Sequence, residues 1–178
     1  MAHEIVTRPE TAADHDAIEN VVRSAFGRQS EARLVAALRA LADFDPELSL
    51  VAVAGGTVVG HILFTPVSVL RAGESPVAAL ALAPLAVLPG LQRRGIGSVL
   101  VRDGLQACRQ RGHELVIVVG HPSYYPRFGF VPARARGLEV PFAVRDEAFM
   151  LCELGGKSAS ARPHVRGMVQ YPAPFLAV

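Results

Sequence analysis

The stretch Leu85–Ser98, LAVLPGLQRRGIGS, decides the fold that we expect for this chain. An apolar run ends at Val87, a Pro-Gly turn follows, and a helical pattern opens at Ser98. This order predicts a strand, a glycine-bearing loop and a helix N-terminus, where the first backbone amides have no partner inside the helix and carry partial positive charge. Glycines also let the backbone approach a phosphate closely. The stretch therefore predicts an anion site, with a diphosphate as the first candidate ligand.

The composition is that of an ordinary globular protein. The chain has 178 residues, of which 51% are hydrophobic and 19% are charged, and its net charge of +2 is too small to indicate a nucleic-acid partner. No apolar run approaches the length of a membrane span, and the first residues lack an apolar signal core. We expect one domain over residues 1–178, located in the cytoplasm, with Cys108 and Cys152 as buried thiols rather than a disulfide.

Hydrophobic periodicity predicts an α/β (α+β) chain. Thr11 with Asp14 is typical of a helix start, and Ser30 can begin a second helix. The apolar stretch 77–87 should be a central strand covered on both faces, although Pro84 within it predicts a bulge or a release from the neighbouring strand. A helix over 98–111 should connect it to a parallel strand over 115–119. The other expected strands cover 3–8, 48–54, 57–70 (after a Gly55-Gly56 turn), 138–142 and 149–154, and the tail from Val165 can form a last one.

A glycine pair after a strand is by itself weak evidence for any one phosphate ligand. No Gly-Lys-Ser/Thr sequence follows, so the loop is not a phosphate-binding loop of the nucleotidase type. The dinucleotide fingerprint needs a third glycine, but Ser98 stands just after Gly97, and Gln110 and Arg111 lie where its acidic residue would be sought. Both nucleotide-binding interpretations are therefore disfavoured.

A second motif lies downstream of the loop, at 124–130, and reads YYPRFGF. Together with Val87, Pro89 and the loop 92–97, it resembles the GNAT superfamily of acyl-CoA-dependent N-acyltransferases. The two motifs and the spacing between them are jointly specific, and the order of elements fits over most of the chain. The resemblance implies a mixed, mostly antiparallel sheet with a central, splayed parallel strand pair flanked by helices.

The resemblance also implies acetyl-CoA as the co-substrate and no metal. In the family, the loop amides seat the CoA diphosphate, and the strand before the loop pairs with the pantetheine arm. A strand released near Pro84 would leave backbone groups free for that pairing, whereas the competing interpretation is a simple edge bulge. The arginine side chains of the loop can assist or remain solvated. Carried onto this sequence, the cofactor-binding residues are Leu85, Ala86, Val87, Gln92, Arg93, Arg94, Gly95, Ile96, Gly97, Ser98 and Tyr125.

Tyr125 matches the family position whose hydroxyl protonates the departing thiolate; the alternative is a packing role beside the cofactor. Many relatives use a glutamate on a central strand as the general base, but 77–87 and 115–119 contain no carboxylate. His61 on the return strand and His121 after the next parallel strand are the candidate bases, because imidazole titrates near neutral pH. A lone histidine in a strand is more often structural, and a water chain or no dedicated base is the remaining alternative.

The expected reaction is direct attack of a primary amine on the acetyl-CoA thioester. Neither cysteine has a partnered histidine nearby in sequence, which disfavours an acyl-enzyme. The acceptor is a small-molecule or peptide amine, which the sequence does not specify. A non-catalytic acyl-CoA sensor or partner-binding module would carry the same motifs and is the competing interpretation. The apolar tail that ends in Pro174, Phe175 and Leu176 can pack against a second subunit, as in a homodimer.

Overall fold

The computed structural model describes residues 4–155 and 165–177, and these form two compact units. Of the described residues, the first unit contains 4–65, 83–107 and 173–177, and the second contains 66–82, 108–155 and 165–172. Two long strands, β3 (Thr57–Leu70) and β4 (Val77–Val87), and one helix, α3 (Ile96–Gln110), have residues in both units. Most of the polar loop expected after Gly155 lies outside the described residues.

The first unit is built on an antiparallel set of strands. β1 (Ile5–Pro9) pairs with β2 (Ser49–Ala54), and β2 pairs with the first half of β3. The β2–β3 hairpin turns at Gly55 and Gly56, whose φ values of 54° and 80° are the left-handed pair that a tight two-residue hairpin requires. Beyond the other edge of β3, the Leu88 amide at the end of β4 donates to the Val59 carbonyl at 3.0 Å. The strand order in this unit is therefore β1-β2-β3-β4.

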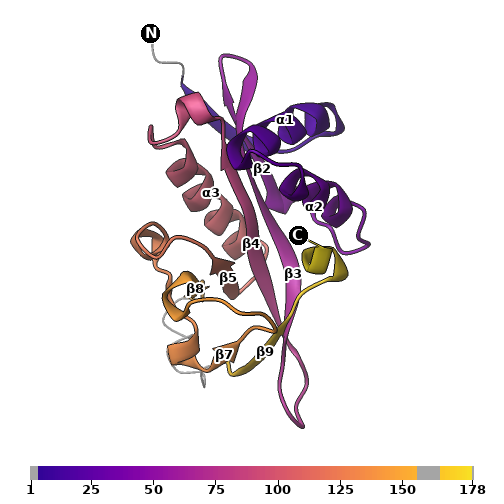
Figure 1. Cartoon of the computed structure of the whole chain (residues 1–178), viewed down its shortest axis with the longest axis vertical. Helices are drawn as coiled ribbons and strands as arrows, with labels where there is room; N and C mark the ends of the chain where they lie inside the picture. Colours follow the sequence, from indigo (N-terminus) through magenta and orange to yellow (C-terminus); the bar gives the residue numbers. More distant parts are fainter. Residues whose placement is uncertain (1–3, 156–164, 178) are drawn as a thin grey trace. The chain divides into compact units, whose positions relative to one another are not determined.

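Two helices, α1 (His15–Phe26) and α2 (Ser30–Arg39), cover one face of these strands (Figure 1). The chain enters α1 through a capping arrangement in which Asp14 accepts from the Thr11 amide at 2.7 Å and from its hydroxyl at 2.9 Å. Apolar residues of both helices then pack on apolar side chains of β2, β3 and β4. The core made in this way contains Ile18, Val21, Val22, Ala32, Leu34, Val35, Leu38, Val51, Val58, Leu63 and Ala86.

Helix α3 packs on the opposite face of the same strands, and two glycines permit its close approach. A Cβ on Gly60 would lie 2.9 Å from Cδ1 of Leu100. A Cβ on Gly104 would lie 2.4 Å from Cε2 of Phe64. Since real Cβ contacts are longer than this, both positions require glycine for helix and strand to meet.

The second unit contains the parallel strand pair. The first half of β4 pairs in parallel with β5 (Leu115–Val119), and β5 pairs antiparallel with β8 (Phe149–Glu153), which also pairs with β6 (Val131–Pro132). The second half of β3 pairs with β9 (Gly167–Gln170), and β9 pairs with β7 (Leu138–Glu139). Short 3-10 helices over the two units cover Ala12–Asp14, Pro46–Leu48, Pro89–Leu91, Tyr125–Phe128, Arg134–Arg136, Asp146–Ala148 and Ala173–Ala177.

The expected fold class is confirmed: the sheet is mixed and mostly antiparallel, with one parallel pair and flanking helices. Several boundaries differ from those expected, and the strand expected over 3–8, for example, is Ile5–Pro9. Helix α3 begins at Ile96 instead of Ser98, and the strand expected over 138–142 is only the two-residue β7, because the chain turns away after Glu139. Cys108 and Cys152 are buried and are not joined in a disulfide, as expected. Within the described ranges, no helix is long and apolar enough to cross a membrane.

Candidate functional site

The loop between β4 and α3 lies wholly in the first unit. It leaves β4 through a 3-10 turn at Pro89–Leu91, and the Gln92 side chain then folds back, donating from Nε2 to the Val87 carbonyl at 3.0 Å. The side chains of Gln92, Arg93 and Arg94 are exposed, whereas Ile96 is buried and anchors the start of α3. The loop thus has a fixed base and an exposed outer rim.

The backbone of this loop is shaped like an anion-binding nest. Arg93 has φ of 60° and Gly95 has φ of 89°, so two left-handed residues precede the first turn of α3. Such alternation turns successive N–H groups toward one concavity, and the helix dipole adds partial positive charge there. A Cβ at Gly95 would meet nothing within 4 Å, so the space in front of this backbone is open. The geometry fits a diphosphate.

The strand residues before the loop, Leu85 to Val87, continue β4 beyond its parallel pairing. The register of β4 with β5 contains Leu80 with Val116 and Ala81 with Ile117. Pro84, which follows a cis peptide bond with Ala83, comes three residues after that register ends. On the β3 side, the Ala86 carbonyl oxygen lies close to Gly60, 3.2 Å from the position that a Cβ would take there.

Tyr125 lies in the second unit, where its ring is held in an apolar setting. It is 7% exposed, and its ring centroid is 5.5 Å from that of Phe130 and 5.2 Å from that of Tyr124, both edge-on. A Cβ on Gly120 would lie 2.4 Å from Cε2 of Tyr125, so glycine is needed there to admit the ring. Burial raises the pKa of Tyr125. The hydroxyl therefore keeps its proton at neutral pH and can act as a donor.

His121 is close to Tyr125 in the same unit. Its side chain is exposed, and its carbonyl accepts from the amides of Tyr124 at 3.0 Å and Tyr125 at 3.4 Å. The structure thus brings His121 and Tyr125 onto one turn after β5, although the contact between them is made by the backbone.

His61 lies on β3 in the first unit, and its ring is completely buried. Its Nε2 is 2.9 Å from the Ser49 hydroxyl and 3.4 Å from Oε2 of Glu10. The Ser49 hydroxyl in turn donates to Glu10 Oε2 at 2.5 Å. Burial lowers the pKa of His61 more than the neighbouring Glu10 carboxylate raises it. The imidazole is therefore neutral at physiological pH.

Glu10, Ser49 and Arg39 were not predicted as site residues. Arg39 of α2 donates to Glu10 through Nε at 2.6 Å and through Nη2 at 3.1 Å. Burial alone would raise the pKa of Glu10, but the hydrogen bonds from His61, Arg39 and Ser49 outweigh it and lower the pKa to about 2. The sequence signal was present but faint: polar residues interrupt strands that are otherwise apolar.

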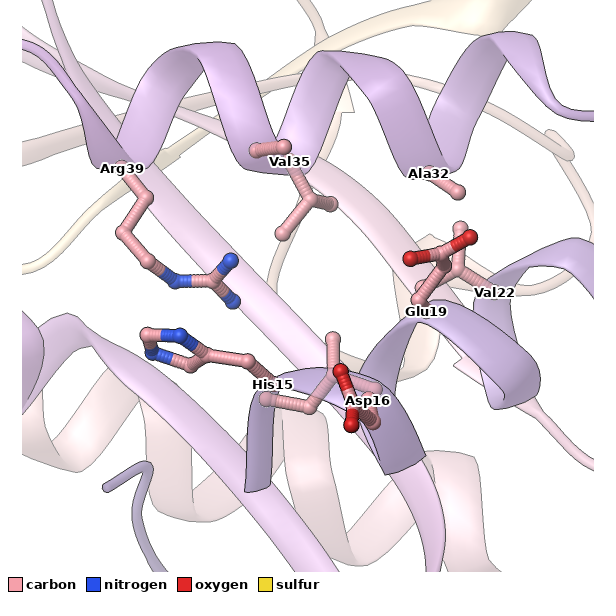
Figure 2. Close-up of a pocket in the computed structure, with 9 residues that line it drawn as sticks. His15, Asp16, Glu19, Val22, Ala32, Val35 and Arg39 are labelled. Atoms are coloured by element: carbon pink, nitrogen blue, oxygen red, sulfur yellow. The ribbon is translucent and has the colours of Figure 1, made fainter. Parts of the chain in front are cut away.

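A groove of about 190 Å³ lies between α1 and α2, and Arg39, the partner of Glu10, is one of the residues that line it. Arg39 and His15 point toward each other at one end of this groove, and Asp16 and Glu19 lie at the other (Figure 2). His15 Nε2 is 3.5 Å from Oε1 of Glu10. Within the described part of the chain, no group of three histidine, cysteine or carboxylate side chains could hold a metal ion.

These features agree with a family match. Residues 6–133 match the acetyltransferase (GNAT) domain family. The match covers more than half of the chain and contains the loop, His61 and Tyr125. The chain therefore belongs to the GNAT superfamily of N-acetyltransferases, and it is an acyltransferase.

Individual relatives agree with this membership. The chain is 39% identical to the uncharacterized N-acetyltransferase YjhQ of Escherichia coli K12, over 86% of this chain and 87% of that protein. The crystal structure of the N-acetyltransferase YhbS from E. coli, in complex with CoA, is 31% identical, with a TM-score of 0.85 over 99% of this chain and 94% of that one. A GNAT acetyltransferase from Brucella melitensis, in complex with acetyl-CoA, is 33% identical, with a TM-score of 0.76 over 97% and 99% of the two chains.

Proposed function

We propose that this protein transfers the acetyl group of acetyl-CoA to a primary amine by direct attack. The observation that carries the proposal is the left-handed loop at Arg93 and Gly95 in front of α3, in a chain that belongs to the GNAT superfamily. Relatives similar over nearly their whole length are described in complex with CoA and with acetyl-CoA. In this chain, the loop would bind the phosphates of the same kind of ligand.

The cofactor residues follow from the loop and the strand before it. The amides between Gln92 and Ser98 would bind the diphosphate, with the exposed Arg93 and Arg94 able to add charge at the rim. The backbone of Leu85, Ala86 and Val87 would pair with the pantetheine arm as an added strand does. One Val87 carbonyl lone pair is already engaged by Gln92, which limits the pairing at that end.

Tyr125 is the proposed acid. When the amine nitrogen bonds to the acetyl carbon, the carbon–sulfur bond breaks and the sulfur leaves as a thiolate that needs a proton. A buried phenol that stays protonated is suited to supply it. His61 and His121 are the two candidate bases: His121 has an exposed ring and His61 a buried, neutral one.

We further propose a small-molecule or peptide amine as the acceptor and the cytoplasm as the location, the latter supported by the two buried cysteines, which are not joined in a disulfide. The C-terminal tail contributes Phe175 to the core of its own first unit and leaves Leu176 exposed. A homodimer through that tail stays a prediction.

The test is CoA release from acetyl-CoA, followed with a thiol reagent in the presence of small primary amines, polyamines, free amino acids and peptides. We expect release that depends on an amine and that falls about 10²- to 10⁴-fold in kcat for Tyr125→Phe, as for loss of a general acid. Tyr124→Phe is the matched control, because it removes the neighbouring hydroxyl instead.

Two other outcomes would contradict the proposal. Tight CoA binding without turnover for any amine would indicate an acyl-CoA sensor. Thermal protection by a nucleotide and none by CoA would indicate a nucleotide-binding protein.

A further inference from the structure

One atom of the buried network has no explanation in the fold. Nδ1 of His61 is buried and has no hydrogen-bond partner among the described residues. Leaving a buried polar atom unpaired costs about 1–3 kcal/mol, so most native proteins avoid it. The other nitrogen of the same ring is held closely by Ser49 and Glu10. One nitrogen of the ring is thus paired and the other is not, which indicates a functional role for the unpaired nitrogen.

The hydrogen bonds of the network have a fixed direction. Glu10, with a pKa of about 2, is a carboxylate at neutral pH and can only accept. The Ser49 hydroxyl has one proton, and it donates that proton to Glu10 at 2.5 Å. Ser49 must therefore accept from His61, whose Nε2 carries the ring proton. In a neutral imidazole, this leaves Nδ1 unprotonated, with its lone pair available.

The negative charge of the Glu10 carboxylate is stabilised by its other neighbours. Arg39 donates to both carboxylate oxygens, and His15 Nε2 lies 3.5 Å from Oε1. Figure 2 shows His15 and Arg39 side by side in the groove. If His61 gained a proton at Nδ1, the positive charge would be stabilised by Glu10 through Ser49. This is the logic by which a buried carboxylate orients and supports a catalytic histidine, here with a serine hydroxyl between the two.

His61 also lies next to the strand that is proposed to hold the pantetheine arm. Its neighbour Gly60 is packed against the Ala86 carbonyl, and Val59 accepts from the Leu88 amide at 3.0 Å. These contacts lie within the first unit, so the histidine and the segment Leu85 to Val87 occupy adjacent strands. The base that removes a proton from the attacking amine is needed close to that segment.

We propose that Nδ1 of His61 is the general base of this acetyltransferase, with Ser49 and Glu10 as positioning residues that keep its proton on Nε2. Because the ring has no exposed surface, this role requires that a water molecule enter beside Nδ1 when the amine binds and carry the proton to it. The amine nitrogen loses a proton to that nitrogen, its electron pair forms the bond to the acetyl carbon, and the carbon–sulfur electrons leave with the sulfur. This inference rests on the proposed function.

The tautomer is tested without any activity. Long-range ¹H–¹⁵N spectra of protein labelled at its histidines, assigned with His61→Gln, should show a ring at pH 7 that is protonated at Nε2 and bare at Nδ1. Ser49→Ala should mix the two tautomers, and Ser49→Thr, which keeps a hydroxyl, should restore the first. A wild-type ring protonated at Nδ1 would overturn the proposal.

Kinetics test the role of the base. His61→Gln keeps a donor toward Ser49 but has no basic nitrogen, and we expect kcat to fall about 10²- to 10⁴-fold with the KM for acetyl-CoA changed less than about twofold. Full kcat in this variant would overturn the proposal while leaving the acetyltransferase activity established. Wild-type protein that releases no CoA with any amine would instead contradict the proposed function itself.

The pH dependence of kcat tests whether Glu10 positions His61 or has only a structural role. The described charged groups around His61 are Glu10 and Arg39, with His15 beyond Glu10. Because Glu10 raises the pKa of His61, Glu10→Gln should move the acidic limb of kcat to lower pH and lower the plateau about tenfold. The matched control is Asp14→Asn, which removes another buried, arginine-paired carboxylate and should leave the limb in place. An unmoved limb in Glu10→Gln would overturn the positioning role.

Discussion

Tyr125 and His61 are both buried, proton-carrying side chains, but their surroundings are opposite in kind. Tyr125 is surrounded by aromatic rings in the second unit, whereas His61 belongs to a polar network that includes an ionised carboxylate in the first. Burial disfavours the charged form of each group, so it keeps the proton on the phenol and off the imidazole. One physical cause thus favours the proposed role of acid for Tyr125 and the proposed role of base for His61.

The largest expected effect comes from removing the cation of the polar network around His61. Arg39→Met leaves the Glu10 carboxylate buried without its principal cation, and we expect the free energy of unfolding at pH 7 to fall by about 3–5 kcal/mol. Urea denaturation measures it. Arg8→Met, at an arginine whose side chain is 41% exposed beside Asp14, should cost less than half as much. Equal losses would mean that burial of the pair does not matter.

Acid should weaken the same network over a defined pH range. The pKa of Glu10 is about 2 in the folded state and near 4.5 otherwise, so its contribution is present above pH 4.5 and is lost as the pH falls toward 2. His61, whose pKa is lowered, adds a loss in the same direction that begins below about pH 6.5, because the unfolded chain takes up a proton first.

The combined decrease should reach about 3 kcal/mol or more between pH 6.5 and 2, measured by urea denaturation at successive pH values. Glu10→Gln should remove the contribution of Glu10 below pH 4.5 and leave those of Asp14 and Glu31, whose pKa values are also lowered. His61→Gln should remove the part that begins near pH 6.5. A wild-type curve that is flat over this range would contradict the assignment.

The apolar surroundings of Tyr125 are tested by adding a methyl group next to its ring. In Gly120→Ala, the new methyl group would lie 2.4 Å from Cε2 of Tyr125, so the ring must shift. We expect a loss of about 1–3 kcal/mol in thermal or urea denaturation, together with a lower kcat. Gly90→Ala, where a Cβ meets nothing within 4 Å, should leave the stability within about 0.5 kcal/mol of wild type.

The smallest expected effect sharpens the comparison. Tyr125→Phe keeps the ring and its contacts with Phe130, so the free energy of unfolding should change by no more than about 1 kcal/mol. The same variant should lose most of its turnover. A large loss of stability would mean that the hydroxyl is part of the folding core.

Local patterns in the sequence were sufficient for much of this fold. The Gly55-Gly56 turn, the Thr11–Asp14 capping arrangement and the strand 115–119 could be predicted because each depends on neighbours in sequence. The extent of β7 could not, because a strand at that place is defined by pairing with β9, far along the chain.

The candidate site divides in the same way. The loop and Tyr125 were predicted from motifs, and His61 from its residue type. Glu10 and Ser49 were not predicted, because their contacts with His61 form only when β1, β2 and β3 lie side by side. Many proteins have a glutamate directly after a strand or a serine at the start of an apolar strand. Neither residue alone therefore predicts a functional site.

The position of Glu10 bears on how this protein can be recombined with its relatives. One carboxylate accepts from or contacts side chains of α1, α2, β2 and β3, which come from four separate stretches of the chain. A chimera that exchanges the two N-terminal helices for those of another GNAT protein must carry a partner for this carboxylate with them. The segment from Glu10 to His61 is therefore best exchanged as one block.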